Sequence, residues 1–571
     1  MSHLTKRWLI APRPTPEEEA KLIRVPPILR EIVFNRNCRT YEEVRAFLEA
    51  HMPEGTEPEN MLGVSQAADR ICFAIERGEK IAVYGDYDVD GVTSTALLTQ
   101  VLKAFHADVQ GYIPNRFEEG YGVNIEALET LREDGVGLVI TVDCGIRSLE
   151  EAEHARRLGM DMIISDHHHP SQEIPLALAV INPKQPGDAY PEKNLAGVGL
   201  AYKLAAALFE RISLSLNGAA QLSDALDLVA LGTVADMAPL RGENRALVRQ
   251  GLRAIRHSQR QGLVSLINIS RISQLRVTAS DIGFILGPRL NAAGRLESAL
   301  ASLDLLTTDN RMVAGLLAQQ LENQNRERQD ITRQIQEQAE KMALEKDPQA
   351  LLLFAAHPDF NSGVVGLAAS RLMEHYYRPA IVAQQGETYT RGSCRSIKEF
   401  HITDALDQCA DLLEHHGGHA AAAGFTVRNE RLPELLERLR AIAEEKLSNQ
   451  ELRPTLNADV ELPLSDLKPE LISLLKYLEP TGQENNAAVF VSRDLRVVNH
   501  RTVGRNASHL KLTVSDGDIY YDAIAFGKGY WEEQMPSRLD LMYHFEVNEY
   551  NGNSSLQLRV VDLKPAGTPD N

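Results

Sequence analysis

Three aspartates occupy alternate positions in the segment VYGDYDVDGVTS, residues 83–94: Asp86, Asp88 and Asp90. An apolar run, IAVYG, precedes them, and a helical pattern, GVTSTALLTQVLKAF, follows them. The segment therefore predicts a buried strand that turns into a helix, with three carboxylates at the turn. Ligands of open α/β sheets bind beyond the carboxyl ends of the strands, so these carboxylates stand where a ligand is expected.

Further acidic and histidine residues follow the next two predicted strands. Asp143 follows the run GVGLVITV, and Asp166, His167 and His168 follow MDMIIS. Carboxylates gathered closely raise one another's pKa, and a divalent cation removes that conflict. Oxygen ligands mixed with imidazole suit Mn²⁺ or Mg²⁺ better than a metal that prefers thiolate. We expect these strand ends to converge on a metal site, with room for the two ions used in attack on phosphorus.

Each of these residues also has an ordinary structural interpretation. Aspartates in turns often cap helices or bend the chain, and for Asp86 alone this is as good an explanation as metal binding. We interpret His169 as a solvated neighbour and Cys144 as a small core residue. Asp236, in LGTVADMAPL, ends an apolar helical run and on its local sequence is a surface residue. Only the whole set, at three successive strand ends, argues against coincidence.

The remaining pattern predicts several domains. From residue 80 to about 240, short apolar runs alternate with amphipathic stretches, which predicts a parallel sheet with helices on both faces. Residues 309–346 contain no proline, and no glycine after Gly315. They predict one long exposed helix that bridges two domains, with a helix packed into a bundle as the alternative. A second α/β pattern follows from 350 to about 448.

After Pro454 the sequence is rich in short strands. The turn dipeptides Asp516-Gly517 and Asn551-Gly552 join some of them. Five or so strands in about 110 residues predict a small closed barrel, with the OB-fold as first choice. Its aromatic and basic residues could stack bases and follow a nucleic-acid backbone, although about half of the aromatics would be core. These residues are Tyr520, Tyr521, Phe526, Trp531, Arg493, Arg496, Arg501, Arg505 and Lys511.

The composition narrows the class of protein. Taken alone, the net charge of −19 over 571 residues argues against a polyanionic partner, although a basic groove can lie on an acidic body. The five cysteines are scattered and form no CxxC pair, as expected in a reducing compartment without a zinc site. No apolar stretch approaches the roughly 20 residues of a membrane span, and the N-terminus has too short an apolar core for a secretory signal. We expect a cytoplasmic protein.

The segments GDYDVDG, DCG, DHH and GTVADMAPL together resemble the DHH phosphoesterase superfamily, and within it the bacterial RecJ family of single-strand-specific exonucleases. The resemblance continues through IPNRFEEGYGVN, GPRLNAAGRLESA, GVVGLAASRL and GGHAAAAGF, and so covers residues from about 60 to 450. It implies an α/β fold with a parallel-sheet DHH domain, a long bridging helix, a second α/β domain of the DHHA1 type and a C-terminal OB-like β-barrel. The implied boundaries are an N-terminal helical segment 1–60, a DHH catalytic domain 61–308, a bridging helix 309–346, a DHHA1 substrate-binding domain 347–450 and an OB-fold nucleic-acid-binding domain 451–571.

The resemblance also implies the site residues. The metal ligands would be Asp88, Asp90, Asp143, His167 and Asp236, with direct ligation by Asp86 left open. His168 would approach the scissile phosphate or support the metal shell, and Asp166 is a candidate to orient an imidazole. The implied substrate-binding residues are Arg116, Arg289, Asn291, Arg295, Ser393, Arg395, Gly417, Gly418 and His419.

Four of these residues, Arg116, Arg295, Ser393 and Arg395, would form a pocket for a terminal 5′-phosphate. For the arginines, ion pairs with nearby glutamates such as Glu118 or Glu297 are the alternative. The family commonly has alanine at the position of Cys394, and we expect little effect from this small difference. Tyr84 stands where related phosphatases often carry a histidine, which suits the exonuclease branch.

The activity that the resemblance implies is 5′-to-3′ hydrolysis of single-stranded DNA. Nucleoside monophosphates would be released by water attack assisted by Mn²⁺ or Mg²⁺, in DNA recombination and repair. A single-strand-binding protein and a RecQ-type helicase are the implied partners, and no membrane is involved. One alternative is a DHH phosphatase acting on short oligonucleotides or cyclic dinucleotides, but such chains tend to lack the barrel. A non-catalytic single-strand-binding replication factor is the other, but it would have lost the metal residues that this chain retains.

Overall fold

The computed structural model describes residues 5–116, 118–120, 122–212, 222–550 and 553–570. The chain forms two compact units, each built from several segments. Unit 1 comprises Met1–Arg7, Arg295–Glu297 and Gln320–Thr455, and unit 2 comprises Trp8–Gly294, Ser298–Gln319 and Leu456–Asn571.

The parallel sheet predicted for the first half of the chain is confirmed and lies in unit 2. Its strands run in the order β3-β2-β4-β5-β6, and every neighbouring pair is parallel. The elements are α4 (Val64–Arg77), β2 (Lys80–Gly85), α5 (Val89–Ala104), β3 (Val109–Tyr112), α6 (Ile125–Glu133), β4 (Val136–Val142), α7 (Leu149–Arg157), β5 (Asp161–Ser165), β6 (Ala179–Ile181) and α8 (Gly197–Ile212).

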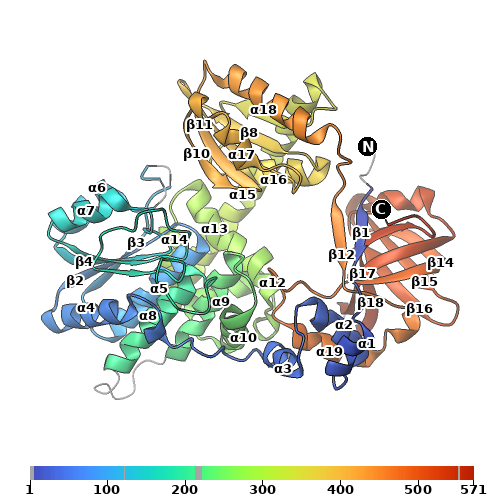
Figure 1. The fold of residues 1–571 in the computed structure, drawn as a ribbon, viewed down its shortest axis with the longest axis horizontal. Coiled ribbons are helices and arrows are strands. Elements are labelled where there is room, and N and C mark those ends of the chain that lie inside the picture. The colour runs from blue at the N-terminus through green and yellow to red at the C-terminus, as the bar shows by residue number, and fades with distance from the viewer. Residues whose placement is uncertain (1–4, 117, 121, 213–221, 551–552, 571) are drawn as a thin grey trace. The chain divides into compact units, whose positions relative to one another are not determined.

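Helices cover both faces of this sheet. Helices α6 and α7 lie on one face, and α4, α5 and α8 lie on the other (Figure 1). Successive side chains of a strand point to opposite faces, and in β2 all four residues from Ile81 to Tyr84 are fully buried. Strands buried on both faces are apolar without a break, which is why the sequence pattern predicted them.

A helical layer follows the sheet within unit 2. It contains α9 (Leu226–Ala235), α10 (Gly242–His257), α11 (Gln261–Ile269), α12 (Ala279–Asp281), the π-helix η4 (Ile282–Leu286), α13 (Gly287–Leu296) and α14 (Leu300–Thr307). Helix α9 is apolar on all sides because it packs against α5, α8 and α10. A Cβ atom at Gly232 would lie 2.3 Å from Thr93 Oγ1, so glycine lets α9 approach α5 closely. Among the described residues, no helix is long and apolar enough to cross a membrane.

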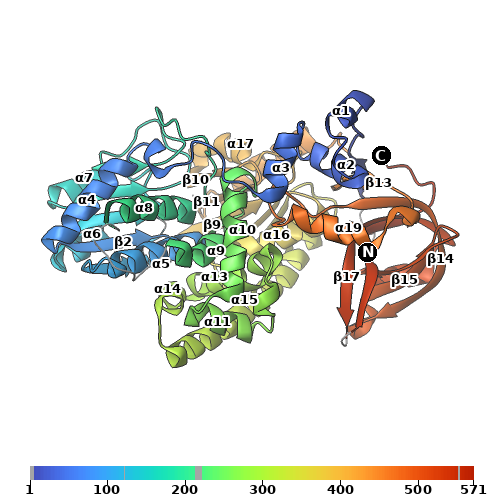
Figure 2. The same ribbon diagram turned by 90° about the horizontal axis from the view of Figure 1, so that it is seen from below.

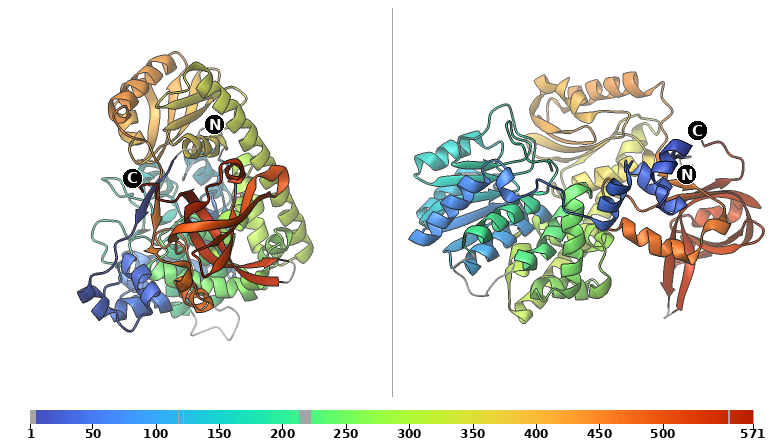
Figure 3. Two further views of the ribbon diagram at one scale, coloured as in Figure 1. Left: turned by 90° about the vertical axis from the view of Figure 1, so that its right-hand side faces the viewer. Right: turned by 60° about the horizontal axis from the view of Figure 1, so that its bottom comes forward.

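The predicted long helix is confirmed as α15 (Arg311–Lys346), which is drawn as one uninterrupted helix in Figure 3. Its 36 residues, at 1.5 Å each, give a length of about 54 Å. It is not exposed on every side, because Ile335, Ala339 and Ala343 are buried in the core of unit 1. The division between the two units falls inside this helix, between Gln319 and Gln320.

Unit 1 contains a mixed sheet in the order β10-β11-β9-β8-β7. Only β7 and β8 are parallel, and the other neighbours are antiparallel. The elements are β7 (Leu353–His357), α16 (Val365–Tyr376), β8 (Ala380–Gln385), β9 (Tyr389–Arg395), α17 (Ile402–Asp407), β10 (Leu413–His419), β11 (Ala422–Arg428) and α18 (Leu432–Leu447).

The predicted C-terminal barrel is confirmed, and pairing of β14 with β17 closes it. Its strands are β13 (Val460–Glu461), β14 (Phe490–Val503), β15 (His509–Ser515), β16 (Tyr520–Ala525), β17 (Arg538–Tyr550) and β18 (Asn553–Pro565). The Asp516-Gly517 turn joins β15 to β16, and Gly517 has a φ of 118° that favours glycine. The Asn551-Gly552 turn lies outside the described residues.

The N-terminal helices pack on this barrel, which local sequence patterns did not indicate. Leu29 and Ile32 of α2 (Pro27–Asn35) share one apolar core with Phe490 and Tyr543 of the barrel. Helices α2 and α19 (Pro469–Leu475) lie beside the barrel in Figure 2. The other elements here are α1 (Pro16–Lys21), α3 (Tyr41–Glu49), η7 (Lys476–Leu478) and the pair of strands β1 (Arg7–Ile10) and β12 (Thr455–Ala458).

Arg245 of α10 ties the helical layer to these segments. Its side chain is 1% exposed and stacks 4.2 Å from the Phe47 ring centroid. The guanidinium donates hydrogen bonds of 2.8–3.0 Å to five backbone carbonyls, those of Phe47, Tyr477, Leu478, Glu479 and Pro480. The last carbonyls of a helix are partially negative, so helix ends and stacking stabilise this buried cation.

Candidate metal centre

The order of the parallel strands defines where a ligand is expected. Numbered along the chain, the five strands run 2-1-3-4-5, and the direction of winding reverses between β2 and β4. A sheet of this order binds its ligand at that point, beyond the carboxyl ends of the strands. The turn with Asp86, Asp88 and Asp90 follows β2, and Asp143 follows β4. The acidic groups therefore lie at the expected position.

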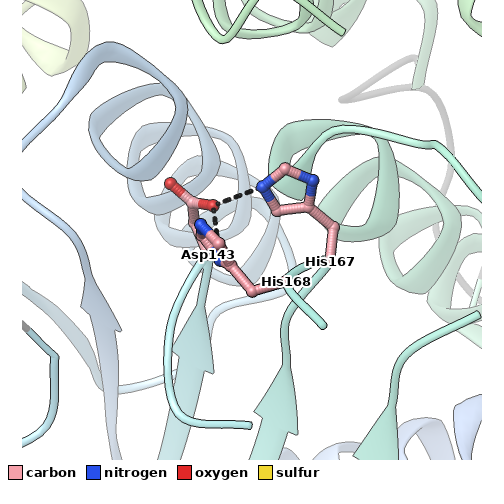
Figure 4. A group of neighbouring side chains, drawn as sticks. All are labelled: Asp143, His167 and His168. Atoms are coloured by element: carbon pink, nitrogen blue, oxygen red, sulfur yellow. Dashed lines mark ion pairs between the residues drawn. The ribbon is translucent and has the colours of Figure 1, made fainter. Parts of the chain in front are cut away.

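Side chains from four segments meet there. His167 Nε2 lies 3.1 Å from Asp143 Oδ1, 3.8 Å from Asp236 Oδ2 and 3.9 Å from Asp90 Oδ2. His167 and His168 both point toward Asp143 (Figure 4), and His168 Nδ1 lies 3.9 Å from Asp143 Oδ1. Three overlapping groups each bring their ligand atoms within 4.8 Å of one another: Asp143 with His167 and His168, Asp90 with His167 and Asp236, and Asp86 with Asp88 and Asp143.

Several atoms of this cluster are buried without compensation. Asp86 Oδ1, Asp143 Oδ1 and His167 Nε2 make no hydrogen bond of acceptable geometry within the described part of the chain. Leaving a buried polar group unpaired costs about 1–3 kcal/mol, and more for a charged one. Carboxylate oxygens and an imidazole lone pair facing one another are the donor set that Mn²⁺ and Mg²⁺ accept. The residues present therefore fit a divalent cation.

Burial and mutual repulsion determine the protonation of the carboxylates. Burial, followed by the charges of Asp90 and Asp88, raises the pKa of Asp143 well above its usual value. Burial and the same two charges raise the pKa of Asp236 to about 9. Burial and the charge of Asp88 raise the pKa of Asp90 to about 7. A bound cation would reverse these shifts, because it stabilises the charged form of each carboxylate.

His167 is neutral and oriented to offer a lone pair. Burial, with a smaller contribution from the charge of His168, lowers its pKa to about 3. Nε2 is buried and makes no hydrogen bond of acceptable geometry within the described part of the chain. In the tautomer with its proton on Nδ1, the neutral ring offers the lone pair of Nε2 to a metal.

His168 differs from its neighbour. Its Nδ1 lies 2.8 Å from Asp166 Oδ1, and its backbone N–H donates to the same oxygen at 3.0 Å. Burial alone would lower the pKa of His168, but the hydrogen bond and charge of Asp166, followed by Asp88 and Asp90, raise it overall. The pKa values of the two adjacent histidines are thus shifted in opposite directions, downward for His167 and upward for His168.

The acidic turn after β2 combines structural and chemical roles. Asp88 caps α5, because its Oδ1 accepts hydrogen bonds from the backbone N–H groups of Asp90 and Gly91. Burial, followed by the charge of Asp88, raises the pKa of Asp86 to about 8. The structure therefore brings Asp86 to the edge of the cluster, and direct ligation by it stays a prediction.

The first turn of α8 holds Asp90, and we did not predict this contact. The backbone N–H groups of Gly197 and Val198 donate to the two oxygens of Asp90 at 2.6 and 2.8 Å. A Cβ atom at Gly197 would lie 2.7 Å from Asp143 Cβ, so the close approach needs glycine. Glycine just before a predicted helix was the only sequence signal, and it resembles many helix starts.

Arg116, Arg289 and Asn291 also belong to unit 2. The Arg116 guanidinium carbon lies 4.9 Å from the centroid of the ring of Tyr87, a residue of the acidic turn. Arg289 of α13 donates to the carbonyl of Ile285 at 2.8 Å, and Asn291 follows on the same helix. The structure thus brings Arg116 beside the acidic turn, while Arg289 bonds within its own helical segment.

Unit 1 gathers three other predicted residues, Arg295, Ser393 and Arg395. Arg395 donates to Ser393 Oγ at 3.2 Å and to the Cys394 carbonyl at 2.7 Å, and no carboxylate of the described chain pairs with it. A Cβ atom at Gly366, in the first turn of α16, would lie 2.9 Å from Ser393 Oγ. Arg295 donates to the backbone carbonyl of Gly363 at 3.2 Å. We call these residues, with the start of α16, the arginine cradle. Guanidinium, hydroxyl and helix-start groups suit an anion such as phosphate.

The remaining predicted residues of unit 1 lie on the exposed edge strand β10. Gly417, Gly418 and His419 are exposed there. Gly418 has a φ of 147°, and a Cβ atom on it would lie 2.4 Å from the Ala422 carbonyl. His419 pairs with Ala422, which pairs in turn with Arg395, so His419 is two strands away from the cradle.

The barrel divides its aromatic and basic residues between core and surface. Tyr521 and Trp531 pack against the core, while Tyr520 and Phe526 are more than half exposed. Arg493 is an internal structural residue, because Glu461, Asp540 and Asp570 all lie within 2.7–3.1 Å of its guanidinium. We named it among possible nucleic-acid contacts, but these three carboxylates occupy it.

Family models match three parts of the chain. The model of the DHH family, N-terminal domain, matches residues 80–233. The DHHA1 domain model matches 348–445, and the RecJ OB domain model matches 458–562. The fold and the clustered aspartates and histidines thus define an α/β protein of the DHH class.

Individual relatives narrow this class. The single-stranded-DNA-specific exonuclease RecJ of Bacillus subtilis strain 168 is 37% identical over 97% of this chain and 70% of that protein. The exonuclease of the same name from Escherichia coli K12 is 35% identical over 95% of this chain and 96% of that protein. The chain therefore belongs to the RecJ family.

Solved structures agree with this assignment. The crystal structure of RecJ in complex with Mn²⁺ from Thermus thermophilus has a TM-score of 0.85 and 29% identity, over 99% of this chain and 80% of that one. The Mg²⁺ complex from the same organism has a TM-score of 0.79 and 28% identity, over 99% and 79%. One of these structures contains Mn²⁺ and the other contains Mg²⁺, and the donor set of this chain suits either ion.

Proposed function

We propose that this protein is a single-stranded-DNA-specific exonuclease that hydrolyses from the 5′ end and releases nucleoside monophosphates. One observation carries the proposal: Asp143, Asp90 and Asp236 direct their carboxylate oxygens at His167 Nε2. The names of the relatives support the substrate class. Digestion from the 5′ end rests on the family resemblance.

In this proposal the metal ligands are Asp88, Asp90, Asp143, His167 and Asp236. Divalent ions bound there supply a water of lowered pKa and offset the negative charge of the phosphate oxygens. The chain's own part is to hold the ligands in place. The start of α8 fixes both oxygens of Asp90.

His168 serves as the phosphate contact. Its hydrogen bond to Asp166 orients the ring and favours the protonated form, so the ring can donate a charged hydrogen bond. Asp166 is itself fixed, because its second oxygen accepts from the backbone N–H of Ile146 at 2.9 Å. Asp166 is therefore the positioning residue of this pair.

The arginine cradle of unit 1 binds the 5′-phosphate. Arg395 and Ser393 supply donors there, and Arg295 is the further arginine of the set. Each unit has further residues that contact the DNA strand in this proposal. They are Arg116, Arg289 and Asn291 in unit 2, and Gly417, Gly418 and His419 in unit 1. The exposed Tyr520 and Phe526 of the barrel are suited to stacking bases, which favours a polymeric substrate over a dinucleotide.

The cellular setting belongs to the same proposal. The five cysteines, all of them described, are unpaired, as expected for a cytoplasmic protein. A role in recombination and repair, together with a single-strand-binding protein and a RecQ-type helicase, follows from the family resemblance.

A direct test uses an oligonucleotide with a 5′-phosphate and a 3′ label, incubated with the protein and Mn²⁺ or Mg²⁺. We expect mononucleotide release and a ladder of labelled strands that shorten from the 5′ end. A blunt duplex should stay uncleaved, and so should the single strand when a chelator is present. Binding without cleavage would support the replication-factor alternative, and hydrolysis limited to dinucleotides would support the phosphatase alternative.

A further inference from the structure

Side chains from neighbouring loops hold the carbonyls of three consecutive histidines. Lys184 Nζ donates to the His167 carbonyl at 2.5 Å, and Asn182 Nδ2 donates to the His168 carbonyl at 2.8 Å. The carbonyl of the third histidine accepts from Arg147 Nε at 2.9 Å. Asn182 and Lys184 belong to the loop that follows β6.

These bonds begin where the sheet ends. The last backbone bond between the two segments runs from the N–H of Asp166 to the carbonyl of Ile181, the final residue of β6. Beyond that point the histidine turn has no partner strand, and the side chains of Asn182 and Lys184 take over. Because a peptide unit is planar, fixing its carbonyl restricts the backbone on both sides, and with it the direction of each side chain.

The asparagine and the lysine act as one unit. Asn182 is completely buried, and its Oδ1 accepts from the backbone N–H of Lys184 at 2.8 Å. The amide thus uses one end to shape its own loop and the other end to hold His168. A side chain without both a donor and an acceptor cannot replace it.

We propose that Asn182 and Lys184 are positioning residues that hold His167 and His168 in ligand-ready directions before any metal binds. The inference rests on the proposed metal site, but its geometry concerns the protein alone. Groups that orient metal ligands typically change metal affinity or activity about 10- to 100-fold when removed. A simple charge effect of Lys184 has the opposite sign, because removing a cation beside carboxylates strengthens cation binding.

The same loop offers a matched control in Lys193. Its Nζ donates to the carbonyls of Pro183 and Asp188 at 2.7 and 2.9 Å, so it also holds backbone carbonyls with an ammonium group. Those carbonyls belong to its own loop and not to the histidine turn. Lys193→Met therefore reports what loosening the loop does by itself, whereas Lys184→Met also frees the carbonyl of His167.

The first measurement is hydrogen exchange by mass spectrometry on the metal-free full chain. We expect Lys184→Met and Asn182→Ala to speed exchange in residues 166–169. Lys193→Met should speed exchange only in its own loop, residues 183–190. Unchanged exchange of 166–169 in both test variants would overturn the proposal, and so would equal acceleration there in the control.

The second measurement is calorimetric titration of the metal-free variants with Mn²⁺. We expect about 10- to 100-fold weaker binding for Lys184→Met and Asn182→Ala, near-normal binding for Lys193→Met, and partial recovery for Lys184→Arg. Single-strand binding in the presence of chelator should stay unchanged. Tighter Mn²⁺ binding by Lys184→Met would assign a charge role and refute the positioning role. Hydrogen exchange and Mn²⁺ titration both remain valid if the protein proves not to be a nuclease. Failure of the positioning proposal can therefore be distinguished from failure of the proposed function.

Discussion

We call the group of Asp90, Asp143, His167 and Asp236 in unit 2 the acidic pocket. This group and the arginine cradle of unit 1 are electrostatic opposites. In the pocket, burial followed by the charges of Asp90 and Asp88 raises the pKa of Asp143 and Asp236, and the charge of Lys184 offsets only part of the shift of Asp236. In the cradle, burial lowers the pKa of Arg395, because no carboxylate of the described chain faces it. Acidic groups dominate the first region, and Arg395 of the second forms no ion pair with a carboxylate of the described chain.

Lys203 and Glu243, in contrast, are buried charges that pair with each other. Lys203 lies 2.8 Å from Glu243, and Tyr190 donates to the second oxygen of Glu243 at 2.6 Å. Burying a charge is costly unless a partner compensates it, so uncompensated charge at two places indicates ligands of the opposite sign. The comparison supports the proposal of a cation in the pocket and an anion in the cradle.

Removing one carboxylate from the pocket should have the largest effect. Asp143→Asn keeps the shape but removes a charge that every group in the cluster faces. We expect nucleotide release to fall by at least about 10³-fold and Mn²⁺ binding to weaken sharply. We also expect the metal-free variant to unfold at a higher temperature than the unmodified protein, since a buried repulsion has gone. A metal-free variant of lower Tm would contradict the assignment of uncompensated charge.

The cradle should respond to its own change more mildly. Arg395→Ala should reduce hydrolysis of 5′-phosphorylated strands about 10- to 100-fold, because a charged hydrogen bond to phosphate is lost. Strands with a 5′-hydroxyl should be nearly unaffected, and Mn²⁺ affinity should not change. Arg391→Ala is the matched control, since Arg391 is exposed on the same strand β9. Equal losses of hydrolysis on strands with a 5′-phosphate and with a 5′-hydroxyl would contradict phosphate binding by the cradle.

The pH dependence of metal stabilisation sharpens the comparison. Asp90, Asp86 and Asp236 have pKa values raised to about 7, 8 and 9, so the metal-free folded state binds more protons than the unfolded state. Their charging therefore lowers stability as pH rises from about 4 through about 9, and a cation offsets that loss. The gain in Tm on adding Mg²⁺ should grow between about pH 6 and about pH 8.5. A gain that stays constant over this range would argue against carboxylate ligands of raised pKa.

The paired charges should matter least for activity. Lys203→Met leaves Glu243 buried without its cation, which typically costs about 3–5 kcal/mol of folding free energy. Urea denaturation measures this loss. Since the pair is compensated internally, kcat and Mn²⁺ affinity of the folded variant should stay within about twofold of the original. A selective loss of metal binding would mean that this pair also supports the pocket.

The sequence predicted those parts of the fold that depend on local pattern. Strands β2, β4 and β5 are apolar on both faces, and α15 lacks helix breakers over 36 residues. The four residues of β3, VQGY, are each half-buried and carry no such pattern. Packing of α2 on the barrel joins residues more than 400 positions apart, and no local pattern encodes such a contact.

The residues of the site likewise include some that local sequence patterns predicted and some that they did not. Carboxylates at the ends of parallel strands were predictable, because strand ends meet at one edge of the sheet. Asp236 is different, since it follows the last turn of α9 and only the family resemblance indicated it. Asn182 and Lys184 were missed because they act through backbone carbonyls of another segment. Gly197 was missed because it acts through its own backbone N–H group.

Arg245 has a consequence for how unit 2 comes apart on heating. If the segment 477–480 detached from α10, an arginine would remain in an apolar interior without its carbonyls. Stranding a cation in this way costs several kcal/mol, which penalises every half-detached state. The barrel and the parallel-sheet part of unit 2 should therefore unfold together, with a single calorimetric peak that splits into two in Arg245→Met.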